Sequence, residues 1–190
     1  MTWTIPGTTL QGHREQADQV STLFHSMFLP GDMLLSQAAS VSGLEPYTIQ
    51  NWVKRGFLSP PRNKRYSEPQ LCRILNINML KGALTMEQIC GLLGYINGAL
   101  DDESDDLIRD DELYFMFVRL AARAKDQHHM QQWEDSIQQV LEDYQEPLPG
   151  AKQRIAQVLK VMTAAWFATR MRQDAERMAN ALQNQEKENA

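Results

Sequence analysis

Apolar residues recur at three- and four-residue spacing over most of the chain, which is the pattern of amphipathic helices packed on a core. After a polar N-terminal stretch, the first such pattern covers residues 20–28 and stops at Pro30 and Gly31. We therefore expect residues 1–32 to form a helical N-terminal extension.

Two short helices are predicted next, three residues apart. The first has its apolar residues at 34–41, with Ser36 available as an N-cap, and stops at Gly43. The second has Pro46 in its first turn and Gly56 after its last. Two short helices joined by a tight turn are the arrangement of a helix-turn-helix.

A short prolyl stretch and two helix starts follow this pair. Residues 57–66 contain two prolines and fit a tight ribbon or loop better than a helix. Ser67 with Gln70, and Thr85 with Gln88, match the spacing of a capping box, in which side chain and backbone satisfy each other. Two further helices should begin at these caps.

The second half of the chain predicts two longer helices, over residues 107–145 and 151–184, on either side of a prolyl break. No segment has the alternation of a strand. The fold class is therefore predicted to be mainly α. The expected domains are the N-terminal extension 1–32, a DNA-binding head 33–100, an acidic hinge 101–112, a helical dimerisation or effector domain 113–184 and a disordered tail 185–190.

The net charge of −5 is unevenly distributed along the chain. Residues 46–81 carry a net charge of +6, between segments of −3 (residues 1–45) and −8 (residues 82–190). A basic segment within an acidic protein suits a surface that contacts DNA, because its acidic surroundings suppress nonspecific binding.

Other kinds of chemistry find little support in the residues. Cys72 and Cys90 form no CxxC pair and are interpreted as small core residues, and the neighbouring His128 and His129 would point about 100° apart on a helix, so no metal site is expected. No phosphate-binding glycine loop or nucleophile motif occurs, so we expect no catalytic residue, no enzyme activity and no cofactor. Without a signal peptide or membrane span, a cytoplasmic protein is expected.

Aromatic and methionine side chains in the second half allow two interpretations. Either they line a small-molecule pocket between tail helices, or they are ordinary core residues. The second interpretation is favoured. These residues are Phe115, Met116, Phe117, Trp133, Met162, Trp166 and Met171.

The helix over residues 46–55 has the two faces that a DNA recognition helix needs. Ile49, Trp52 and Val53 form its inner side, and polar side chains face outward, where they can reach base edges or phosphates. The predicted base-proximal residues are Tyr47, Gln50, Asn51 and Lys54. The predicted contacts to the DNA backbone are Ser36, Thr48, Arg55, Arg62, Lys64, Arg65 and Tyr66.

The ordered motifs around this helix resemble the MerR family over residues 33–93. The motifs are Leu35-Ser36-Gln37-Ala38-Ala39, Gly43-Leu44, Thr48-Ile49, Arg55-Gly56-Phe57-Leu58, Arg65-Tyr66-Ser67-Glu68-Pro69-Gln70-Leu71 and Thr85-Met86-Glu87-Gln88-Ile89. The resemblance implies a winged helix-turn-helix. Thr48–Lys54 and Lys64–Ser67 are most similar to an uncharacterised bacterial family with a MerR-like head.

Two departures from the MerR pattern predict weaker contacts with the DNA backbone. Typical MerR proteins have an arginine at the position of Gln50, and their wing between Pro61 and Tyr66 is longer. MerR proteins also dimerise through a long helix and use an added domain to sense a ligand. The resemblance therefore implies a homodimer and leaves room for an unidentified small-molecule or protein effector.

We expect the dimer or effector face to comprise Ile155, Leu159, Met162 and Trp166, and the alternative is that these residues pack within one chain. The predicted function is a sequence-specific transcriptional regulator that binds double-stranded DNA. The alternative is a helical protein-interaction module that keeps the helix-turn-helix scaffold without binding DNA.

Overall fold

The computed structural model describes residues 2–98, 100, 105–124 and 130–188, apart from the side chains of 130–132 and 185–188. Its helices are α1 (Val20–Phe28), α2 (Leu35–Ser42), α3 (Pro46–Lys54), α4 (Glu68–Leu80), α5 (Met86–Asn97), α6 (Asp110–Arg123), α7 (Met130–Val140) and α8 (Ala151–Glu188), with a 3-10 helix η1 (Arg14–Gln19). Its strands are β1 (Thr2–Thr4), β2 (Gln11–His13), β3 (Met33–Leu34) and β4 (Arg65–Tyr66). The chain is mainly helical, as predicted.

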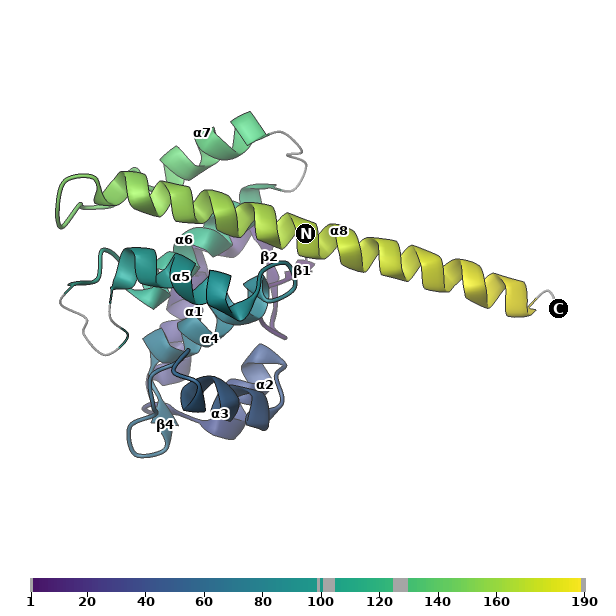
Figure 1. Ribbon diagram of the computed structural model, residues 1–190, viewed down its shortest axis with the longest axis horizontal. Helices are drawn as coiled ribbons and strands as arrows, with labels where there is room; N and C mark the ends of the chain where they lie inside the picture. The colour runs from purple at the N-terminus through teal and green to yellow at the C-terminus, as the bar shows by residue number, and fades with distance from the viewer. Residues whose placement is uncertain (1, 99, 101–104, 125–129, 189–190) are drawn as a thin grey trace.

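Helix α4 is the central element. Nine of its thirteen residues are buried, including the polar Arg73 and Asn76. A helix that is covered on most sides needs several neighbours. These are α6, which packs along it, and α1, α2, α5 and α8 (Figure 1).

The N-terminal extension corrects the sequence prediction, because its first part is a hairpin. β1 and β2 pair antiparallel, with Trp3 opposite Gly12. Each strand has three residues, and in β1 only Trp3 is buried, so the segment is too short to display a recognisable alternation. The predicted helix at residues 20–28 is confirmed as α1.

The same extension packs on α6, far away in the sequence. The buried hydroxyl of Tyr114 donates to the carbonyl of Pro6 (2.8 Å), and Arg14 Nη1 donates to the carbonyl of Ala121 (3.2 Å). Trp3 and Ile5 are both buried in the hydrophobic core. The N-terminal segment is thus part of the core of the protein.

Both predicted capping boxes are confirmed. Ser67 N donates to Gln70 Oε1 (3.0 Å) and Thr85 N donates to Gln88 Oε1 (2.9 Å), while each hydroxyl accepts from the N3 backbone. The predicted N-cap at Ser36 is wrong. Helix α2 already begins at Leu35, because the Gln37 side chain accepts the backbone N–H of residue 34.

The predicted helix over residues 107–145 is two helices, α6 and α7. Helix α6 begins at Asp110, within the predicted acidic hinge, and three acids in its first turn favour that start electrostatically. The prediction joined the two helices although the sequence has no apolar residue between Ala124 and Met130. Residues 101–104 of the hinge and residues 189–190 of the tail predicted over 185–190 lie outside the described residues, and residues 185–188 of that tail are helical as the end of α8.

The buried side chains form one cluster that runs from Trp3 to Trp166. This cluster crosses the predicted boundary between residues 33–100 and 113–184. Helix α8, predicted over 151–184, extends to Glu188, and its first half lies across α5 and α7 (Figure 1). None of the helices in the described residues is sufficiently long and apolar to cross a membrane.

Candidate nucleic-acid interface

Helix α3 lies at the end of the molecule away from α8 (Figure 1), and its outer face is polar and exposed. Ile49 and Trp52 are buried on its inner side against the rest of the head. The four side chains predicted to lie near bases are all exposed: Tyr47, Gln50, Asn51 and Lys54. The structure therefore leaves this helix uncovered along the side that carries hydrogen-bonding groups.

The turn between α2 and α3 depends on Gly43. Its φ is +68°, in the left-handed region that glycine adopts without strain. A Cβ at this position would also lie 2.9 Å from Thr9 Cγ2. Close packing of the N-terminal hairpin loop against this turn thus adds a steric reason for glycine.

A short ribbon of β3 and β4 stands next to the α2–α3 pair. The strands pair antiparallel, with Met33 opposite Tyr66. In the chain, α2 and α3 separate the two strands. The turn that leads into β4 forms the tip of the ribbon: Arg65 N donates to Arg62 O (2.9 Å), and the two residues between them, Asn63 and Lys64, have φ of 49° and 62°. Two left-handed residues closed by this hydrogen bond are the geometry of a type I′ turn, which matches the twist of a hairpin.

The predicted basic contacts fall into two groups. Lys54, Arg62 and Lys64 are exposed, and no ion pair ties their side chains to another described residue. Arg55 lies 4.7 Å above the ring centre of Phe57 and 4.0 Å from Glu87 Oε1, and Arg65 Nη1 donates to Asp32 O (2.8 Å) at the base of the ribbon.

The first group is available for phosphates, while Arg55 and Arg65 also hold local structure. Of the other predicted backbone contacts, Ser36 is exposed and Thr48 is half-buried. Tyr66 corrects the prediction, because its side chain is only 2% exposed and cannot reach a phosphate. Burial also raises the pKa of its phenol.

Arg73 belongs to the core although it was counted in the basic segment. It is 7% exposed, donates through Nε to the carbonyl of Phe57 (3.1 Å) and pairs with Asp110 (3.2 Å). Its charge is therefore neutralised inside the protein and adds nothing to the outer surface.

The predicted dimer or effector face on α8 is corrected as well. Ile155, Leu159 and Met162 are fully buried, and Trp166 is nearly so, within the core of the same chain. Packing within one chain, the alternative considered from the sequence, is what the structure has. The reason is that α4, α5, α6 and α7 all pack on this side of α8.

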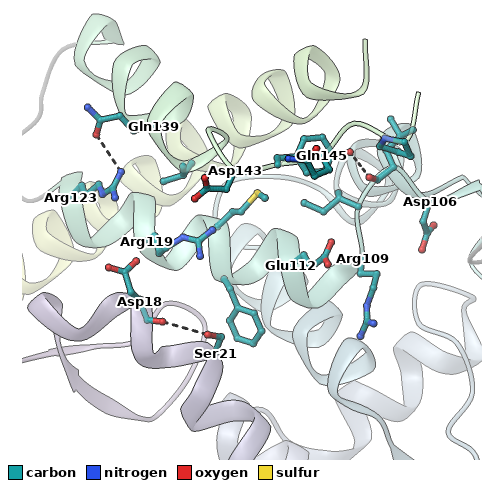
Figure 2. Close-up of a pocket in the computed structure, with 17 residues that line it drawn as sticks. Asp18, Ser21, Asp106, Arg109, Glu112, Arg119, Arg123, Gln139, Asp143 and Gln145 are labelled. Carbon is teal, nitrogen blue, oxygen red and sulfur yellow. Dashed lines mark hydrogen bonds between the residues drawn. The ribbon is translucent and has the colours of Figure 1, made fainter. Parts of the chain in front are cut away.

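A pocket of about 660 Å³ lies between η1, α6 and the end of α7 (Figure 2). Arg119 points into it between Asp18 and Asp143, and Arg123 Nη1 donates to Gln139 Oε1 (3.3 Å) at its rim. Phe115 and other apolar residues line the same pocket. It therefore offers both signs of charge beside an apolar wall.

The sequence prediction missed the charged residues of this pocket, which come from segments about a hundred residues apart. The available signal was Arg119 itself, a single cation inside the apolar run from Leu113 to Ala122. Among the aromatic and methionine residues considered for a pocket, only Phe115 and Met116 line this one. Phe117, Met162 and Trp166 are core residues, and Met171 is exposed.

The cysteines carry no sign of reactivity. Cys72 is buried, and burial, reinforced by nearby acidic groups, raises the pKa of its thiol well above the usual value. Cys90 is half-buried and has its pKa raised by burial too. Within the described ranges no three His, Cys, Asp or Glu side chains gather as a metal site would require, and His128 and His129 lie outside those ranges.

The chain is thus a mainly helical protein with an exposed helix-and-ribbon end and a mixed-charge pocket. Residues 16–117, more than half of the chain, match the family described as Domain of unknown function (DUF1836), so the protein belongs to this family. The matched range covers α1–α5, the ribbon and half of α6. No match was found among curated proteins or among solved structures.

Proposed function

We propose that this protein is a cytoplasmic, sequence-specific transcriptional regulator that binds double-stranded DNA through a MerR-like winged helix-turn-helix at residues 33–100. Helix α3 enters the major groove and the β3–β4 ribbon contacts phosphates. The observation that carries the proposal is the exposed polar face of α3, on the same end of the molecule as the exposed basic tip of the ribbon.

The side chains on α3 suit base recognition. Gln50 and Asn51 can each bind adenine through two hydrogen bonds, and Lys54 can donate to the acceptors of guanine. An α-helix fits the major groove, and nothing in the described chain covers this face. Specificity in this proposal resides in these three residues.

Arg62 and Lys64 suit phosphate binding, because the type I′ turn holds them at the tip of the ribbon. Contacts of this kind position a protein on DNA without reading sequence. With few phosphate contacts, nonspecific affinity should be modest and its dependence on salt shallow for a DNA-binding protein.

The first experiment measures binding to random duplex DNA by fluorescence anisotropy across a salt series. Binding should weaken as salt rises, since each phosphate contact releases counterions. Replacing Arg62 and Lys64 by alanine should weaken binding to all sequences alike and reduce the log–log salt slope by about 2, one unit per contact.

The matched control replaces Arg172 and Arg177 by alanine. These residues lie in the second half of α8, and the change in net charge is the same. Its salt slope should equal that of the unchanged protein. If both double variants lost the same amount of DNA affinity and salt slope, overall charge and not the ribbon would govern binding. This result would contradict the role of the ribbon.

Asn51→Ala should act on specificity. Loss of a two-hydrogen-bond contact is expected to remove about 1–3 kcal/mol of discrimination between a selected site and random DNA. The measurement compares both affinities for the two proteins, after selection of bound genomic fragments. An unchanged ratio would exclude Asn51 from base recognition.

The alternative proposal is a protein-interaction module that keeps this scaffold without binding DNA. Gln50 at the usual arginine position, the two-residue ribbon tip and the net charge of −5 favour it. Absence of salt-dependent DNA binding in the anisotropy series would support the module. The homodimer and an effector stay predictions, and the pocket around Arg119 offers room for the latter.

A further inference from the structure

The second half of α8 projects away from the rest of the protein (Figure 1). Its last close approach to the body is at Thr169, where a Cβ added to Gly82 would lie 2.6 Å from Thr169 Cγ2. From Arg170 to Asn184, every residue except the half-exposed Asp174 is exposed. This arm is therefore a helix without neighbours in its own chain over the described side chains.

An exposed apolar stripe runs along the arm and continues onto the body. Its residues are spaced alternately by three and four, and all of them are exposed. We call the stripe the α8 seam, and its residues are Val161, Ala164, Ala168, Met171, Ala175, Met178 and Leu182. Val161 is 40% exposed, and the three largest residues are each about two-thirds exposed: Met171, Met178 and Leu182.

The spacing is that of a heptad repeat. Val161, Ala168, Ala175 and Leu182 occupy a positions, and Ala164, Met171 and Met178 occupy d positions, over three heptads. A repeat of this kind predicts pairing with another helix that has a matching stripe. The α8 seam is separate from the buried face at Ile155, Leu159 and Met162, so α8 has one apolar side for its own core and another that is open.

We propose that the α8 seam packs against the α8 seam of a second copy of this chain, in antiparallel orientation. This inference deepens the homodimer part of the proposed function by naming its surface. The seam dimer does not depend on DNA binding, so either proposal can fail without the other.

The sizes of the seam residues fit the antiparallel arrangement. When two copies run in opposite directions, a positions face d positions. In the register centred on residue 173, Met171 of one copy faces Ala175 of the other, Met178 faces Ala168 and Leu182 faces Ala164. Each of these three large side chains thus meets an alanine, which fills the interface evenly. A parallel pair would place methionine on methionine and alanine on alanine.

The charges of the arm also fit a second copy. Residues 170–188 carry four basic and four acidic residues, so two arms neither repel each other nor attract a strongly charged partner. Arg172 pairs with Glu176 (2.6 Å) and Arg177 pairs with Asp174 along the same helix. These pairs leave the apolar seam as the main feature by which the arm can recognise a partner.

The test is the mass of the full-length protein by sedimentation equilibrium over about 1–100 µM. The unchanged chain should reach twice its mass of 21.8 kDa. Met171→Glu with Met178→Glu should be monomeric, because like charges would then lie in the seam. Gln173→Glu with Asn180→Glu is the matched control, seven residues apart on the opposite side of the arm, and should remain dimeric.

Because the arm does not contact the body, circular dichroism should show all variants folded. The proposal would be overturned if the unchanged chain were monomeric, even if another molecule bound the arm. It would also be overturned if the Met171→Glu/Met178→Glu variant were dimeric. If both glutamate variants were monomeric, the loss of the dimer would result from added charge on the arm and not from the seam. This outcome would overturn the proposal too.

Disulfide formation tests orientation, in a Cys90→Ala background that removes the half-buried thiol. Met171→Cys with Ala175→Cys should give a covalent dimer on a non-reducing gel. Leu182→Cys alone should not, because antiparallel copies would hold the two positions about 27 Å apart along the axis at 1.5 Å per residue. A covalent dimer through residue 182 would indicate a parallel pair, and no covalent dimer in either variant would exclude the seam as the interface.

Discussion

Replacing Arg73 by alanine is expected to lower the free energy of unfolding by about 3–5 kcal/mol, the usual effect of removing one partner of a buried ion pair. Asp110 would keep its charge at the contact of α4 and α6 with its main cationic partner gone. The carbonyl of Phe57 would also lose its donor. The measurement is urea unfolding of the full-length protein, followed by tryptophan fluorescence.

Two further variants separate the ion pair from simple loss of packing. Replacing Arg73 by methionine together with Asp110 by leucine should restore most of the stability, because a well-packed apolar pair does without the desolvation of two charges. Arg172→Ala, which breaks an exposed pair on α8, should cost less than about 0.5 kcal/mol. A loss below about 1 kcal/mol for Arg73→Ala would contradict the role of the pair.

Phe24→Ala should destabilise the protein by about 3–5 kcal/mol, as expected when a fully buried phenylalanine leaves a cavity. The Phe24 side chain is completely buried, and its ring centre lies 5.4 Å from that of Tyr114 and 5.5 Å from that of Phe115. Helix α1 would lose its main contact with α6. Urea unfolding of the full-length protein measures the change in the free energy of unfolding.

Leu29→Ala, just beyond the end of the same helix, is the control. Leu29 is 84% exposed, so its truncation should change stability by no more than about 0.5 kcal/mol. Equal effects of the two substitutions would mean that the N-terminal extension is not part of the folded core, against the packing described above.

Local signals made most helices predictable from the sequence. The reciprocal hydrogen bonds of Ser67 with Gln70 and of Thr85 with Gln88 involve residues three apart, so their spacing is enough to recognise them. The end of α2 at Gly43 was predictable for the same reason, because a single residue in left-handed conformation stops a helix.

Contacts between distant segments were not predictable in this way. The hairpin of β1 and β2 has strands of three residues, and the burial of Trp3 depends on the other elements of the core. The separation of α6 from α7, in contrast, had a local signal that the prediction passed over, because residues 125–129 are all polar. Helix α8 has two apolar sides, and which of them is buried and which is the α8 seam depends on where the other helices pack.

The candidate interface was predicted in part. The outward direction of Gln50, Asn51 and Lys54 follows from helical periodicity once Ile49 and Trp52 are assigned to the core. Tyr66 was misassigned because a residue next to a basic ribbon tip can point to either face of a strand. In a two-residue strand the sequence holds too little alternation to decide which.

The pairing of β3 with β4 has a consequence for the two helices between them. β3 precedes α2 and β4 follows α3, so the register of Met33 with Tyr66 fastens together the two ends of residues 33–66. The turn at Asn63 and Lys64 leads directly into this pairing, and Tyr66 on the inner face is buried. The place of the basic turn beside α3 is therefore fixed by backbone hydrogen bonds and a buried aromatic ring, and does not depend on the loop alone.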